Sequence, residues 1–194
     1  EISKIPDYYA NHENPLGFCG DVKGWSDFIS QFINVMIKNF GYDEVKQWYF
    51  EFWNEPDHNF WAGTEPISWQ NGVNAKRIED YCKMYDWTVL GIKRISKDLK
   101  VGGPALAGNT VFFNEFLKHC KLGFNDAENK NGTSLDFVSY HIYSNSPDRY
   151  PNPVNAISRI NEYDFIIHKY FENIPVLLTE WGINWGGGKC NREF

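Results

Sequence analysis

The sequence predicts an α/β fold, about half of a (β/α)8 TIM barrel, in which four parallel strands alternate with helices. Short apolar runs that end in polar residues predict the strands, and longer segments with apolar residues at helical spacing predict the helices. Polar side chains follow every predicted strand, as they do where a barrel carries its active site. No glycine-rich phosphate loop follows an early strand, which argues against a doubly wound nucleotide-binding sheet.

The predicted elements alternate along the whole chain after an irregular segment at 1–23. Apolar residues recur at helical spacing over 25–40 and 75–97, and the apolar run 48–53 predicts a strand between them. A polar loop is expected at 123–134. The remaining predicted elements are a strand at 100–103, a helix at 111–122, a strand at 135–140, a helix at 154–172 and a strand at 175–179.

A complete barrel has eight strands and about 250 residues, whereas this chain of 194 residues accounts for four strands. We therefore expect residues 1–194 to form one partial barrel domain. Two or three strands are expected to be missing before residue 1 and at least one after residue 194. Unpaired sheet edges predict that such a piece on its own would be unstable or would self-associate.

Composition excludes several classes of partner. A net charge of −6 argues against nucleic acid and anionic membranes, and no apolar run is long enough to span a bilayer. No signal peptide is visible, so the sequence does not decide between a cytoplasmic and a secreted protein. Cys19, Cys82, Cys120 and Cys190 lie far apart, which makes zinc binding improbable. Cys82 and Cys120 fall in predicted helices and are expected to be buried thiols.

Two glutamates end predicted strands. Glu55 follows the first strand in the run Asn-Glu-Pro, and Glu180 ends the last strand in Thr-Glu-Trp. The carboxyl ends of parallel barrel strands meet at one rim, so the two acids are expected to lie close together. Cleavage of a glycosidic bond needs such a pair, one as proton donor and one as nucleophile. The pair predicts a sugar hydrolase with a carbohydrate substrate.

Several elements in the same order resemble glycoside hydrolase family 39, the β-xylosidases and α-L-iduronidases, which are retaining enzymes on β/α barrels. The resemblance implies that Glu55 is the acid/base, that Glu180 is the nucleophile and that no metal or organic cofactor is needed. It also implies that Asn54 hydrogen-bonds the sugar 2-hydroxyl. The elements are YFEFWNEP at 49–56, FW at 60–61, VGGPA at 101–105, DFVS at 136–139, HIY at 141–143 and TEW at 179–181.

Further side chains complete the predicted site. His141 and Tyr143 end the neighbouring strand and could supply hydrogen bonds to Glu180. Trp181 and Trp61 are expected to form the platform on which a sugar ring stacks, with Phe60 and Trp185 as further candidates.

The subtype stays open. Asp57, His58 and the insertion at 123–133 resemble iduronidases, whereas His141-Ile-Tyr143 and Thr179-Glu-Trp181 resemble xylosidases, which we favour. A family 5 cellulase-like glycosidase is an alternative from the same class. An inactive truncated barrel piece that binds only sugar or a partner chain is an alternative from another class.

Overall fold

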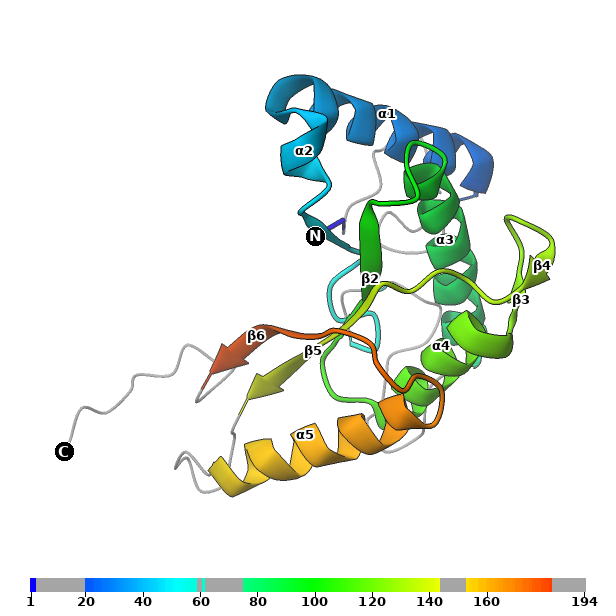
Figure 1. Cartoon of the computed structure of the whole chain (residues 1–194). Coiled ribbons are helices and arrows are strands. Elements are labelled where there is room, and N and C mark those ends of the chain that lie inside the picture. Colours follow the sequence, from blue (N-terminus) through cyan, green and yellow to red (C-terminus); the bar gives the residue numbers. More distant parts are fainter. Residues whose placement is uncertain (3–19, 59–60, 62–74, 144–152, 183–194) are drawn as a thin grey trace.

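The computed structural model describes residues 1–2, 20–58, 61, 75–143 and 153–182. Its main sheet has four parallel strands whose spatial order follows their order along the chain (Figure 1). These strands are β1 (Tyr49–Glu51), β2 (Lys100–Leu106), β5 (Phe137–Tyr143) and β6 (Val176–Gly182). The predicted half-barrel is therefore confirmed: parallel strands adjacent in chain order, connected by helices.

The helices agree with the expected segments, with differences at their ends. They are α1 (Val22–Phe40), α2 (Tyr42–Val45), α3 (Ala75–Lys93), α4 (Thr110–Leu122) and α5 (Pro153–His168). The prediction that the second long helix reaches residue 97 is wrong. The chain turns after Lys93, whose ammonium group donates to the carbonyls of Lys97 and Leu99 and pairs with Asp136 at 2.7 Å.

The segment expected to be a loop at 123–134 contains a small antiparallel hairpin of β3 (Phe124–Asn125) and β4 (Lys130–Asn131). Asp86 of α3 anchors this hairpin. Its carboxylate accepts hydrogen bonds from the Asp126 backbone amide at 3.0 Å and from the Thr133 hydroxyl at 2.5 Å. These polar contacts with α3, about 40 or more residues away in the sequence, explain how a segment with little apolar content is held.

Aromatic side chains form much of the core between the sheet and α3 and α4. The ring of Tyr81 is fully buried and meets Phe112 and Phe116 edge to face, with centroids 5.2 and 5.5 Å apart. Such pairs contribute about 0.5–1.5 kcal/mol beyond their area burial. The Tyr81 hydroxyl donates to the Phe52 carbonyl at 3.0 Å, so α3 is tied to the end of β1. Cys82 and Cys120 are buried free thiols in the same core, as expected.

The end of β1 departs from the expected strand 48–53. Regular pairing stops at Glu51, and the backbone then enters the left-handed region at Trp53 (φ 71°) and Glu55 (φ 45°). On the edge of β1 away from β2, Ile2 forms an isolated parallel bridge with Phe52. In the described part of the chain, no helix combines the length and apolar character needed to cross a membrane.

Candidate active site

Two acids, a histidine and a tyrosine meet at the carboxyl ends of β1, β5 and β6. The Nδ1 atom of His141 lies 2.9 Å from Glu55 Oε1 and 3.5 Å from Glu180 Oε2. The Tyr143 hydroxyl donates to the same Glu180 oxygen at 2.8 Å. One carboxylate oxygen from each acid and a ring nitrogen of His141 all lie within 4.8 Å of one another. The structure thus brings together four of the residues named from the sequence.

Strand register places three of these four side chains. His141 is paired with Glu180 across β5 and β6, and Tyr143 lies opposite Gly182. Alternate residues of a strand project from the same face, so His141 and Tyr143 both point toward the side where Glu180 lies. The register shifts between Tyr140 and His141, at the point where the polar residues begin.

The fourth side chain, that of Glu55, follows the left-handed backbone beyond β1. Its amide donates to the Ala105 carbonyl at 2.9 Å, and the Ala105 amide donates to the Ser139 hydroxyl at 3.0 Å. Ala105 is itself left-handed, with φ of 51°. Non-glycine residues in this region persist where their surroundings hold them, and they cluster at functional sites.

Asp57 is a residue that sequence reasoning assigned only to subtype. Its side chain is fully buried, and its carboxylate accepts hydrogen bonds from the amides of Ala107 (2.9 Å), Gly108 (2.9 Å) and Asn109 (2.8 Å). Burial raises the pKa of Asp57, while the three amide hydrogen bonds oppose the rise. The only signal in the sequence is its position directly after Asn-Glu-Pro.

The surroundings of His141 and Tyr143 raise the pKa of both side chains. Burial lowers the pKa of His141, but the hydrogen bond to Glu55 and the negative charges of Glu180, Glu55 and Glu51 outweigh it, so the pKa is raised. The hydrogen bond to Glu180 is the largest cause that raises the pKa of Tyr143 to about 12. Tyr143 therefore stays a hydrogen-bond donor at neutral pH, and the protonated form of His141 is stabilised relative to a free histidine.

Asn54 presents an acceptor that the described residues leave open. Its Oδ1 atom is buried and has no hydrogen-bond partner within the described ranges. A buried polar atom without a partner is costly, so it is commonly satisfied by water or a ligand. Its place next to Glu55 suits the expected contact with a sugar hydroxyl.

The aromatic residues expected to bind sugar differ from one another. Trp181, directly after Glu180, is 76% exposed and has a free surface. Trp61 is only 1% exposed, and its ring packs edge to face against Trp53 at 4.6 Å. Trp61 packs in the core with Trp53 and Tyr81, so the described structure does not support the expected platform role for this ring. Phe60 and Trp185 lie outside the described residues.

Distance alone would also allow Glu55, His141 and Glu180 to share a metal ion. Two carboxylates and an imidazole are suitable ligands for several divalent ions. The same pair of carboxylates can cleave a glycosidic bond without a metal. The two possibilities differ in their response to a chelator, which is tested below.

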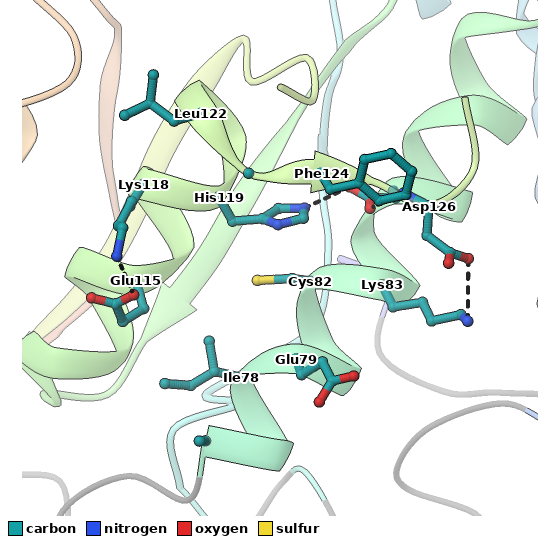
Figure 2. A pocket seen from close by; sticks show the side chains of 13 residues that line it. Ile78, Glu79, Cys82, Lys83, Glu115, Lys118, His119, Leu122, Phe124 and Asp126 are labelled. Carbon is teal, nitrogen blue, oxygen red and sulfur yellow. Dashed lines mark hydrogen bonds and ion pairs between the residues drawn. The ribbon is translucent and has the colours of Figure 1, made fainter. Parts of the chain in front are cut away.

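A separate cavity of about 540 Å³ lies between α3, α4 and β3 (Figure 2), and neither Glu55 nor Glu180 lines it. Its lining includes Cys82, His119 and Phe124, and His119 pairs with Asp86 at 2.8 Å. Burial raises the pKa of Cys82 well above its usual range, and the charge of Asp86 adds to the rise. A thiol in this state is a poor nucleophile, so the cavity does not compete with the acid pair as a reactive site.

The chain is similar to known glycosidases in sequence and in fold. The model of glycosyl hydrolases family 39 matches residues 8–192. A β-xylosidase from Caldicellulosiruptor saccharolyticus is 31% identical over 166 residues, which are 81% of this chain and 30% of the relative. The α-L-iduronidase of Homo sapiens is 28% identical over 121 residues, which are 60% of this chain and 17% of the relative.

A solved structure gives the same result. The family 39 β-xylosidase from Caulobacter crescentus superposes with a TM-score of 0.66 at 27% identity, covering 95% of this chain and 34% of that one. The chain thus spans about a third or less of the length of each of these relatives.

Proposed function

The chain belongs to glycoside hydrolase family 39, and from this membership we propose that its protein hydrolyses terminal glycosidic bonds with retention of configuration, as a β-xylosidase-like enzyme. The observation that carries the proposal is the short separation of the two acids. Their nearest oxygens in the Glu55–His141–Glu180 group lie within 4.8 Å. Retaining glycosidases hold their carboxyl groups about 5–5.5 Å apart, whereas inverting enzymes need about 6.5–9.5 Å to admit a water molecule.

In the proposed first step, a carboxylate oxygen of Glu180 attacks the anomeric carbon. Protonated Glu55 gives its proton to the departing glycosidic oxygen, so that bond breaks and a glycosyl ester of Glu180 forms. In the second step, Glu55 removes a proton from water. The water oxygen bonds to the anomeric carbon, the ester bond breaks and the Glu180 carboxylate is restored.

The hydrogen bonds at the site suit these roles. Tyr143 donates to Oε2 of Glu180, which leaves the other oxygen free to attack. His141 contacts both acids and, as a cation, stabilises negative charge on Glu180 after the ester is cleaved. Asn54 provides an open acceptor beside Glu55 for a sugar hydroxyl, and exposed Trp181 provides an aromatic surface next to Glu180.

A β-xylosidase-like substrate is favoured over an α-L-iduronide by the extent of the similarity. The bacterial β-xylosidase aligns with 81% of the chain, whereas the human α-L-iduronidase aligns with 60%. An iduronide also carries a carboxylate on its sugar ring. Two carboxyl groups, those of Glu55 and Glu180, already lie within 4.8 Å of one another at this site, so a carboxylate on the substrate would meet like charge.

The test uses the full-length protein with an aryl β-D-xyloside and an aryl α-L-iduronide. We expect faster hydrolysis of the xyloside, and proton NMR should show that the first product has the anomeric configuration of the substrate. An inverted first product would reject the retaining mechanism, and preference for the iduronide would reassign the substrate. Activity should survive EDTA; its loss would assign the acid pair to a metal.

A further inference from the structure

Three non-glycine residues adopt left-handed backbone where β1 and β2 end. They are Trp53 (φ 71°), Glu55 (φ 45°) and Ala105 (φ 51°). L-residues rarely adopt this conformation, so surrounding contacts have to hold it. One of the three carries the carboxyl group of the candidate acid/base.

The segment at 55–57 is joined to the segment at 105–109 at two points. The Glu55 amide donates to the Ala105 carbonyl at 2.9 Å. Two residues further along, the Asp57 carboxylate accepts from three successive amides at 107–109, at 2.8–2.9 Å. Because a carboxylate is costly to bury unless its oxygens are hydrogen-bonded, the three bonds make this link a strong one.

We call these links between residues 55–57 and 105–109 the clasp. Two arginines bind its backbone from outside. The Arg77 guanidinium donates to the Pro56 carbonyl at 3.4 Å and the His58 carbonyl at 2.7 Å, on either side of Asp57. Arg159 of α5 donates to the Gly108 carbonyl at 3.2 Å. These contacts fix the backbone on both sides of Asp57 and at Gly108. Among the described side chains, the Glu55 carboxyl group pairs only with His141.

We propose that Asp57 is a positioning residue: by binding the amides of residues 107–109, its carboxylate holds the left-handed backbone that aims Glu55 at the glycosidic oxygen. The proposal rests on the proposed function, in which Glu55 transfers the proton. Proton transfer depends steeply on position, and a shift of about 1 Å can cost about 100-fold in rate. Asp57 itself is buried and does not touch the substrate.

The test compares Asp57→Asn with Asp86→Asn in the full-length protein. Asp86 is a matched control because it is also buried and also holds a backbone amide, that of Asp126, but it lies on α3 beside the separate cavity. In Asp57→Asn either orientation of the side chain points its NH2 group at a backbone N–H, whereas in Asp86→Asn the NH2 group can take the place of the oxygen that faces Thr133 and His119. For each variant, kcat/KM is measured on aryl glycosides with good and poor leaving groups.

We expect Asp57→Asn to lower kcat/KM by about 10–100-fold for poor leaving groups and by less than about threefold for good ones, because good leaving groups need little protonation. Asp86→Asn should lower the melting temperature and leave the dependence on the leaving group as in the wild type. In a Glu55→Ala background, Asp57→Asn should cost little further rate, because no acid remains to be positioned.

Equal losses across the series for Asp57→Asn, as for Asp86→Asn, would overturn the proposal and leave a purely structural role. If Asp57→Asn does not fold, Asp57→Glu decides in the same way, since it keeps both acceptor oxygens but moves them by one methylene. The Glu55→Ala variant alone separates this failure from that of the proposed function. If Glu55→Ala shows no steeper leaving-group dependence than the wild type, Glu55 is not the acid, whatever Asp57 does.

Discussion

The two acids of the site are supported very differently. Glu55 has a side chain 16% exposed and sits where the ends of β1, β2 and β5 meet. Glu180 has a side chain 42% exposed on β6, which is one edge strand of the described sheet, as β1 is the other. Its hydrogen bond and its ion pair both come from β5, through Tyr143 and His141. The described residues therefore hold Glu55, the proposed proton donor, from several sides and Glu180, the proposed nucleophile, from one.

In the proposed mechanism, this difference corresponds to the different tasks of the two acids. A proton donor needs an accurate direction, and the clasp through Asp57 and Ala105 gives the Glu55 backbone one conformation. A nucleophile needs one carboxylate oxygen aimed at the sugar, and the Tyr143 hydroxyl holds the other oxygen of Glu180 by a hydrogen bond. The substitutions below test whether the two sides differ in function as they do in structure.

The largest effect is expected for Glu180→Ala. Removal of the nucleophile should lower the rate at least about 10⁴-fold on every substrate, whatever its leaving group. Azide should then attack from the vacated face and give a glycosyl azide of inverted configuration, which NMR identifies. A retained azide product would assign Glu180 to the acid/base role instead.

A smaller and selective effect is expected for Glu55→Ala. Loss of the proton donor should cost about 10²–10⁴-fold on poor leaving groups, while nitrophenyl glycosides keep their first step. Azide needs no general base, so it should restore turnover and give a product of retained configuration. The measurement is a leaving-group series with product stereochemistry. Uniform loss across the series would contradict the contrast between the two acids.

A smaller loss, about tenfold, is expected for Tyr143→Phe, which removes the hydrogen bond to Glu180 Oε2 and keeps the ring. Because Tyr143 supports the nucleophile alone, the loss should be similar for good and poor leaving groups. Kinetics on the same substrate series measure this. A loss confined to poor leaving groups would mean that Tyr143 acts through Glu55.

The sequence predicts those features of the site that depend on the local pattern of apolar and polar residues. Glu55 and Glu180 end apolar runs, and parallel strands with helical connections have their carboxyl ends at one rim, so their meeting could be predicted. The turn after Lys93 could not, because it depends on a tertiary ion pair with Asp136. The local pattern of apolar residues does not contain that contact.

The contacts that hold the backbone at Glu55 could not be predicted from the sequence, for a related reason. The partners of Asp57 are backbone amides about 50 residues away, and an amide has no residue-type signature. Trp61 shows a second limit, since the same ring suits a sugar platform or a core. Its burial and its contacts with Trp53 and Tyr81 in the folded structure favour the core.

The smallest expected effect is a pH dependence of the free energy of unfolding. It arises from His141, which contacts both Glu55 and Glu180. The pKa of folded His141 is raised because its hydrogen bond to Glu55 and the nearby negative charges outweigh burial. The folded state therefore binds more protons than the unfolded state at pH values above the ordinary pKa of histidine, about 6.5. The stabilisation is fully present below that pH and is lost as the pH rises through the folded pKa.

We therefore expect the free energy of unfolding of the full-length protein to fall as the pH rises from 6 upward, by on the order of 1 kcal/mol from this contact. His141→Gln keeps a polar side chain at the position but cannot take up a proton, so its stability should lack this component. The measurement is urea unfolding of both proteins at several pH values, with the difference between them plotted against pH. A difference that stays constant with pH, or that grows as the pH rises, would show that His141 is not held as a cation between the two acids, and the electrostatic link between the two sides would have to be abandoned.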